Sequence, residues 1–220
     1  MPKIKMPKAS PSLDMTPMVD LAFLLVTFFM LTAQFRGEEP VIVDIPASQK
    51  EIPIPDRDIM TITIDSADRV FFNIDNKAVR ANLLKKMGEK YNVSFTEEQT
   101  KTFSLMNSFG VTINNLTEFI SSNEGGQEKM NKQTKGIPVD SANAATNQLR
   151  DWIIFGRLAS AEFHRDKGEA NVSKLRFAIK GDARANYEII NAILKTFQRT
   201  DINVNQFNLL TDLEGKVTAE

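Results

Sequence analysis

The longest apolar run of the chain lies near its N-terminus. Of the 21 residues in positions 15–35, 15 are apolar and only Asp20 is charged. A helix over residues 16–35 would be about 30 Å long, which matches the hydrocarbon thickness of a bilayer. The pattern therefore predicts a single transmembrane helix over residues 15–35.

Two other interpretations of this run are a cleaved signal peptide and a buried helix of a soluble protein. A cleaved signal peptide also places basic residues before an apolar stretch, but here Pro17 and Asp20 stand at the start of the run and no small-x-small cleavage site follows. A buried helix of a soluble protein would leave a polar face for water, whereas residues 21–35 are apolar nearly all round. The positions of Pro17 and Asp20 and the apolar residues all round the helix therefore favour a membrane span over both alternatives.

Charges on either side of the run predict its orientation. Three lysines precede it and three acidic residues soon follow it: Lys3, Lys5 and Lys8, then Glu38, Glu39 and Asp44. The positive-inside rule places residues 1–14 in the cytoplasm as a short tail and the rest of the chain outside, in the periplasm. Residues 36–58 carry four prolines and are predicted to form an extended linker, within which residues 41–43 could add an edge strand.

Beyond residue 58 the pattern changes to that of a folded domain. Residues 59–64 alternate apolar and polar positions, turn at 65–68 and continue into 70–74, which predicts a β-hairpin followed by a helix over 76–91. A second block reads strand 174–180, helix 185–199 and strand 204–210. In that helix an apolar stripe from Tyr187 to Phe197 is predicted to lie on the sheet.

Between these blocks, residues at about 92–171 form a mostly helical insertion. Thr96 and Gln99 resemble a capping box that opens a helix over 97–107, and further helices are predicted at 115–122 and 142–164. Gly125 and Gly126 read as a loop. The predicted fold is a single N-terminal transmembrane helix plus a small two-layer α+β periplasmic domain over 59–220, with this insertion.

Composition narrows the functional classes. The 27 basic and 28 acidic residues give a net charge of -1, and no basic cluster interleaved with aromatics is present, so nucleic acid is not an expected partner. The absence of cysteine excludes disulfides, thiolate catalysis and cysteine-based zinc sites.

Asp20 is the main candidate for chemistry. A charged carboxylate in hydrocarbon costs several kcal/mol, so the neutral form is favoured and the group can take up and release a proton. Thr16 and Thr27 fall within about 40° of Asp20 around a helix and form one polar stripe with it. The alternative for Asp20 is an interfacial carboxylate near the helix start, and for the two threonines it is ordinary packing within the helix.

No catalytic or metal-binding constellation is found in the rest of the chain, so we expect no enzyme activity, no cofactor and no metal. His164 is the single histidine and is predicted to lie at the surface. Asp182 is predicted to be the N-terminal residue of the helix that follows it.

Residues 13–25 read LDMTPMVDLAFLL, and this segment resembles the signature of the ExbD/TolR family of biopolymer transport proteins. A basic tail, a Thr-Pro-x-x-Asp entry to one span and a periplasmic α+β domain are the family layout. Lys180-Gly181-Asp182, followed by residues 187–200 and 205–210, also resembles the family's C-terminal strand, helix and strand. The resemblance covers about 8–36, 59–80 and 174–212 and is not found in the insertion.

The resemblance implies an inner-membrane motor subunit in which Asp20 is the essential protonatable residue, with Thr16 and Thr27 on the partner-facing side. It further implies a homodimer inside a pentameric ring of ExbB/TolQ-type subunits, with proton flow energising a TonB-type protein. The alternatives are a TolR-like role in outer-membrane integrity, with attachment to peptidoglycan, and a membrane-anchored periplasmic binding module without ion transport. A flagellar stator role is disfavoured because no OmpA-like wall-binding sequence follows the run.

Overall fold

The computed structural model describes residues 15–32, 41, 43–44, 47–48, 58–143, 145–168, 175–204, 206–210 and 212–213. Contacts divide the chain into two units, residues 1–37 and residues 38–220. The predicted tail at 1–14 lies outside the described residues. Within the described part, the helices and strands are α1 (Thr16–Thr32), β1 (Ala47–Ser48), β2 (Ile59–Ile64), β3 (Val70–Ile74), α2 (Lys77–Tyr91), α3 (Glu97–Leu105), α4 (Ile113–Ser121), α5 (Glu124–Gln133), α6 (Gln148–Asp166), β4 (Arg176–Gly181), α7 (Tyr187–Gln198), β5 (Asn208–Leu210) and β6 (Asp212–Leu213).

Helix α1 is the described part of the predicted span. It contains 17 residues and no buried side chain. No helix among the described residues is both long enough and apolar enough to cross a membrane. Positions 33–35 of the predicted span lie outside the described residues.

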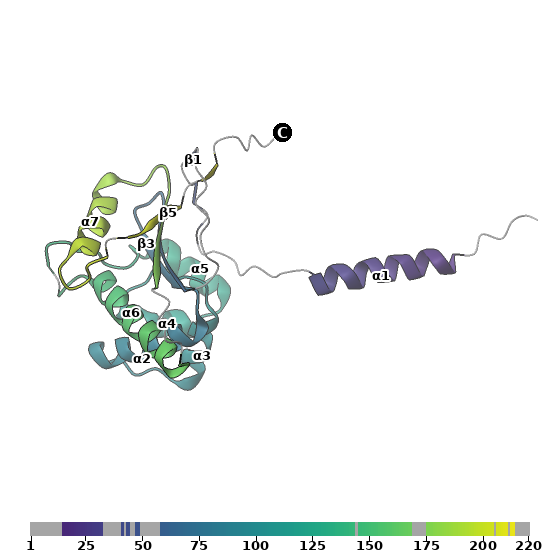
Figure 1. Ribbon diagram of the computed structural model, residues 1–220, viewed down its shortest axis with the longest axis horizontal. Coiled ribbons are helices and arrows are strands. Elements are labelled where there is room, and N and C mark those ends of the chain that lie inside the picture. Colours follow the sequence, from purple (N-terminus) through teal and green to yellow (C-terminus); the bar gives the residue numbers. More distant parts are fainter. Residues whose placement is uncertain are drawn as a thin grey trace, which may run out of the picture. The chain divides into compact units, whose positions relative to one another are not determined.

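The second unit is built on a four-stranded sheet with the order β3-β2-β4-β5 (Figure 1). The predicted hairpin is confirmed, because β2 and β3 pair antiparallel with Ile62 opposite Phe72. β4 then pairs parallel with β2, and β5 pairs parallel with β4. Parallel neighbours require crossover connections, and the helices α2–α6 and α7 supply them.

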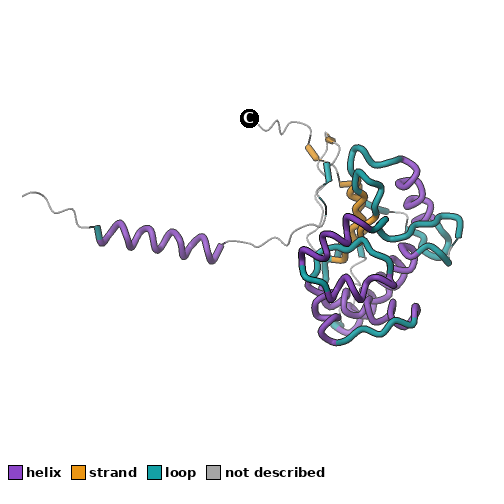
Figure 2. Tube along the Cα trace, turned by 180° about the vertical axis from the view of Figure 1, so that it is seen from behind, coloured by secondary structure: helices purple, strands orange, loops and turns teal. Residues whose placement is uncertain are grey.

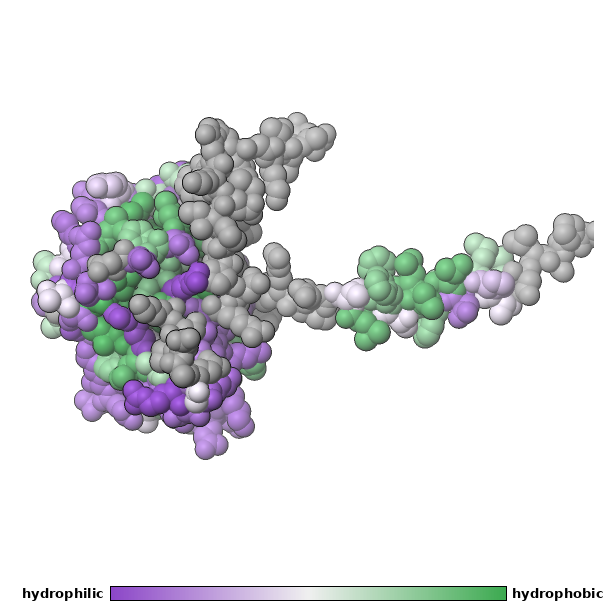
Figure 3. All heavy atoms as spheres, in the orientation of Figure 1, coloured by the Kyte–Doolittle hydropathy of each residue, from purple (hydrophilic) through white to green (hydrophobic). Residues whose placement is uncertain are grey.

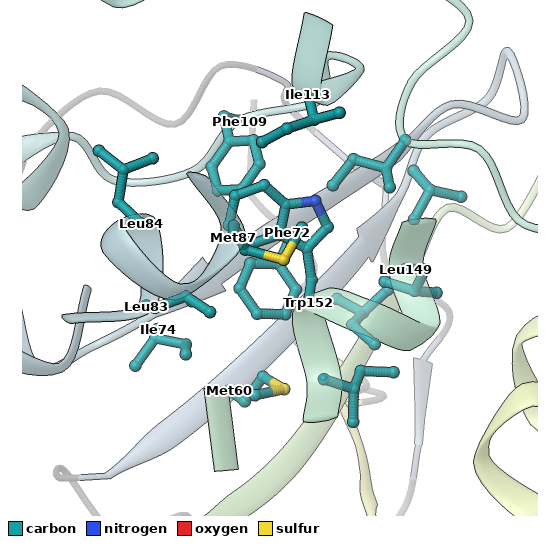
Figure 4. Packing of buried hydrophobic residues seen from close by; sticks show 14 of the residues in the cluster. Met60, Phe72, Ile74, Leu83, Leu84, Met87, Phe109, Ile113, Leu149 and Trp152 are labelled. Carbon is teal, nitrogen blue, oxygen red and sulfur yellow. The ribbon is translucent and has the colours of Figure 1, made fainter. Parts of the chain in front are cut away.

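One face of this sheet carries the core. Met60, Ile62 and Ile64 point to the same side as Phe72 and are all buried, because alternate residues of a strand share a face. Helices α2, α6 and α7 cover that side with Leu83, Trp152 and Phe197, among others. Figure 4 shows Leu83 and Trp152 near Phe72 of the sheet. The small two-layer α+β fold is therefore confirmed, and among the described residues it comprises seven helices with α1 counted in.

The predicted insertion is part of this core rather than an appendage. Helices α3–α6 all lie within residues 92–171. Figure 2 shows that helices make up much of the second unit. Gly156 of α6 lies so close to the sheet that a Cβ atom there would stand 2.6 Å from Met60 Cε. Trp152, one turn earlier, packs among Phe72, Phe103 and Phe109 with ring centroids 4.8–6.3 Å apart. The insertion thus supplies α6, one of the helices that cover the sheet.

Local signals explain where most helices begin. The capping box at α3 is confirmed, since Thr96 Oγ1 accepts from Gln99 N–H and the Gln99 side chain accepts from Thr96 N–H. The prediction of a loop at Gly125 and Gly126 is wrong, because α5 contains both glycines. Asn123 caps that helix by accepting a hydrogen bond from Gly126 N–H, and the helix then continues to Gln133.

Three boundaries differ from expectation. α6 begins at Gln148, not at position 142, because the Asn147 side chain caps it by accepting from Arg150 N–H. The strand predicted from position 204 forms only over Asn208–Leu210. Of the predicted edge strand at 41–43, Val41 and Val43 lie outside any strand and position 42 is outside the described residues; the strand nearby is β1, which pairs parallel with β6.

Candidate functional site

Helix α1 carries the residues that the sequence singled out for function. The helix begins at Thr16, and Val19 N–H donates to Met15 C=O at 3.1 Å, so Asp20 stands one turn inside it. At 100° per residue, Thr16 and Thr27 lie on the same face of the helix as Asp20. The structure therefore brings the three residues onto one stripe of α1.

The surface around that stripe is apolar (Figure 3). Met18, Leu24 and Leu31 are 60%, 64% and 87% exposed, and Asp20 is exposed as well. Among the described residues, none makes a hydrogen bond or ion pair with the Asp20 carboxylate. A lone carboxylate on an apolar helix needs a protein or water partner from outside this helix if the helix is placed in lipid.

The Thr27 hydroxyl is bonded within the helix. Thr27 Oγ1 donates to the carbonyl oxygens of Phe23 at 3.0 Å and Leu24 at 2.9 Å, so its proton is already used within the helix. Such bonding is typical of packing threonines in apolar helices. Thr16 is the first residue of the helix.

A second polar centre lies at the end of β4, where Asp182 was predicted to begin a helix. That prediction is wrong, because Asn186 caps α7 by accepting from Glu188 N–H. The Asp182 carboxylate is instead buried and accepts from Arg184 N–H at 2.9 Å and from Asp44 N–H at 3.2 Å. The hydrogen bonds from Arg184 hold the pKa of Asp182 below its ordinary value, against the opposing effect of burial.

Asp182 thereby fastens the linker that precedes the domain. Ala183 N–H donates to the Asp44 carbonyl at 2.8 Å, and the Arg184 guanidinium lies 3.2 Å from the Asp44 carboxylate. The residue beside it, Val43, is buried. The sequence did not predict a role for Asp44 or Arg184. No local signal links these two residues, because they stand 140 positions apart in the chain.

His164 was predicted to lie at the surface, and this is wrong. Its side chain is 5% exposed in the last turn of α6, and Nε2 lies 3.3 Å from Asp58 Oδ1. The charged residues around it in the sequence suggested a solvated helix end, but the packing of α6 on the sheet buries this position. The predicted core stripe of α7 holds at Ile193 and Phe197, whereas Tyr187 is 71% exposed.

A further buried carboxylate ties α2 to α6. Asp151 Oδ2 accepts from the Tyr91 hydroxyl at 2.7 Å, and Oδ1 lies 2.5 Å from Lys90 Nζ and 2.8 Å from Arg150 Nη1. Burial of the Tyr91 ring and its hydrogen bond to Asp151 raise the pKa of the phenol above its ordinary value. Both carboxylate oxygens of Asp151 have partners, which is typical of a carboxylate that stabilises the fold. Within the described part of the chain, no cluster of three metal-ligating side chains is found.

Comparison with known proteins assigns the chain to a family. The family model described as Biopolymer transport protein ExbD/TolR matches residues 6–213. No curated protein and no solved structure matches the chain. Proteins of this family are generally anchored in the inner membrane and work with ExbB/TolQ-type and TonB/TolA-type partners. Because the match runs from the segment before α1 to the last described strand, this chain belongs to the ExbD/TolR family of biopolymer transport proteins.

Proposed function

We propose that this chain is the ion-carrying subunit of a proton-driven motor in the bacterial inner membrane, and that Asp20 carries the protons. The observation that supports this most directly is the placement of Asp20. It is the one charged side chain of α1, one turn inside the helix, and the family match begins before that helix.

The energetics of the position suit the role. A charged carboxylate in hydrocarbon costs several kcal/mol, so in a membrane Asp20 needs a wet, protein-lined path beside it. One elementary charge that crosses 100 mV delivers about 2.3 kcal/mol. Several protons supply enough free energy to rotate or pull a partner protein.

The family and the sequence support the remaining parts of the proposal. The apolar run 15–35 crosses the membrane with residues 1–14 in the cytoplasm and the α+β domain in the periplasm. An ExbB-type ring surrounds a dimer of this chain and forms the wall that faces Asp20, with Thr16 and Thr27 on the same side. A TonB-type protein receives the motion and energises transport across the outer membrane.

Substitution of Asp20 tests the proposal in cells. Asp20→Asn should abolish energy-dependent uptake through outer-membrane receptors while the chain still assembles with its membrane partner, because the amide cannot carry a proton. Asp20→Glu should retain part of the uptake. Thr32→Val serves as a control, since Thr32 lies about 120° from the stripe and its hydroxyl donates to Phe28 C=O at 2.8 Å. Normal uptake together with normal detergent resistance in an assembled Asp20→Asn variant would refute the role of Asp20.

The same variants separate the two branches of the family. A chain of the TolR type leaves uptake intact when Asp20 is changed to Asn, but makes cells sensitive to detergents because outer-membrane integrity fails. If both uptake and detergent resistance are normal, the chain is a membrane-anchored binding module.

A further inference from the structure

Strand β3 is an outer strand of the sheet with an unusual sequence for that position. Its residues are Val70, Phe71, Phe72, Asn73 and Ile74, with no charge and no proline. Uncharged, apolar and β-prone segments at an exposed sheet edge pair readily with strands of other molecules. The opposite edge strand, β5, has three residues, and its shortness alone limits such pairing.

The outward side of β3 is covered by two pieces of the insertion. Phe72 N–H donates to Phe109 C=O at 2.9 Å, and Phe109 N–H donates back to Phe72 C=O at 3.1 Å. One step along the edge, Ile137 N–H donates to Val70 C=O at 2.9 Å. Arg80 of α2 donates to Ile74 C=O. All three outward carbonyls of β3 therefore have partners before any other chain arrives.

Two glycines allow this cover to approach the strand. Gly136 has φ +79°, and a Cβ atom there would lie 2.4 Å from Val70 N. A Cβ atom at Gly110 would lie 2.4 Å from Phe71 Cδ1. The two pieces are fastened to each other because Thr134 Oγ1 donates to Gly110 C=O at 3.1 Å.

We propose that residues 109–137, named here the edge cap, prevent a second copy of this chain from adding a strand to β3. A second copy is the partner to be excluded because identical apolar strands stack in register with matched side chains. The edge cap gives a role to the part of the insertion that lies along the outer edge of the sheet. It does not depend on proton carriage by Asp20.

The test uses the full-length chain in detergent micelles and two glycine variants. Gly136→Ala places a methyl group against β3, whereas Gly168→Ala meets the same left-handed backbone, φ +68°, with no atom within 4 Å. Hydrogen exchange of the Phe72 amide reports the opening of the cap, exchange of the β2 amides reports folding, and light scattering against concentration reports self-association.

In Gly136→Ala we expect the Phe72 amide to exchange about tenfold faster, with β2 still protected, and species larger than the wild-type assembly to appear as concentration rises. Gly168→Ala should match the wild type in assembly size. If Gly136→Ala unfolds the domain, Thr134→Val replaces it, since this change removes only the hydrogen bond to Gly110. Faster exchange of the Phe72 amide without larger species would overturn the proposal. So would wild-type exchange of that amide in both Gly136→Ala and Thr134→Val.

Discussion

At the scale of single residues, a buried carboxylate links α2 to α6. Asp151 is 2% exposed at its side chain and is held by Tyr91, Lys90 and Arg150. Its removal takes the acceptor from the Tyr91 hydroxyl and from the partly exposed cations of Lys90 and Arg150. Groups of this kind are costly to break even when the intact cluster adds little net stability.

Asp151→Ala should therefore lower the free energy of unfolding by about 3 kcal/mol. Denaturant unfolding of the variant and the wild type measures the difference. Glu128→Gln is the control, because its ion pair with Lys132 within α5 is exposed and its loss should leave stability unchanged within error. Equal stabilities for Asp151→Ala and Glu128→Gln would contradict the account of this cluster.

Tyr91 predicts how stability depends on alkaline pH. Burial and the hydrogen bond to Asp151 raise the pKa of the folded phenol above that of the unfolded chain, which is about 10. The stabilisation by the neutral phenol is therefore complete below about pH 10 and is lost as the pH rises toward the folded pKa. Tyr91→Phe should be less stable at neutral pH, yet lose less further stability above about pH 10. If the wild type and Tyr91→Phe lose the same amount of stability above about pH 10, ionisation of Tyr91 is not coupled to unfolding.

At the scale of elements, two helical glycines stand in opposite surroundings. A Cβ atom at Gly88 in α2 would lie 2.5 Å from the carbonyl oxygen of Val93, whereas at Gly125 in α5 nothing lies within 4 Å. The segment after α2 thus folds back over Gly88 at a distance that only glycine allows.

Gly88→Ala should destabilise the domain by about 1–3 kcal/mol, because the backbone after α2 must move. Gly125→Ala should stabilise it by about 0.5–1 kcal/mol through helix propensity alone. Thermal melting of the two variants checks the opposite signs. If Gly88→Ala and Gly125→Ala are both more stable than the wild type, the backbone after α2 moves away from position 88 at little cost in free energy.

Elements were predictable where the signal is local. The alternation in β2 and β3, the capping box at Thr96 and the apolar spacing in α7 each act within a few residues, and these elements formed near their predicted positions. Helix α5 was not predicted because two adjacent glycines are typical of a loop, although Asn123 caps the helix in the structure. Asp182 was misassigned because a second candidate cap, Asn186, stands four residues later.

At the scale of the whole molecule, the remaining unpredicted features depend on distant contacts. Asp44 meets Asp182, Asp58 meets His164, and β1 pairs with β6. A single sequence gives no signal that joins such positions. For the candidate site, the stripe of Thr16, Asp20 and Thr27 was predictable from helical spacing, while what faces it depends on other chains.

The position of α6 leads to a prediction about the insertion. Deletion of residues 92–171 should abolish cooperative unfolding, because Met60, Phe72 and Ile74 would lose the helix that buries them. Removal of residues 1–37 is the control, since α1 contributes no buried residue and this unit is separate from the domain by contacts. Circular dichroism during heating compares the two. A cooperative transition in the chain without 92–171 would show that the insertion is dispensable for folding.

The central claim is that Asp20 carries protons, and proton flux tests it most directly. The full chain and its copurifying multi-span partner are reconstituted in vesicles under a membrane potential, with a pH-sensitive dye inside. We predict proton entry for the wild-type complex and for Asp20→Glu at a reduced rate, and no entry above that of empty vesicles for Asp20→Asn. Wild-type flux through the Asp20→Asn complex would contradict the account.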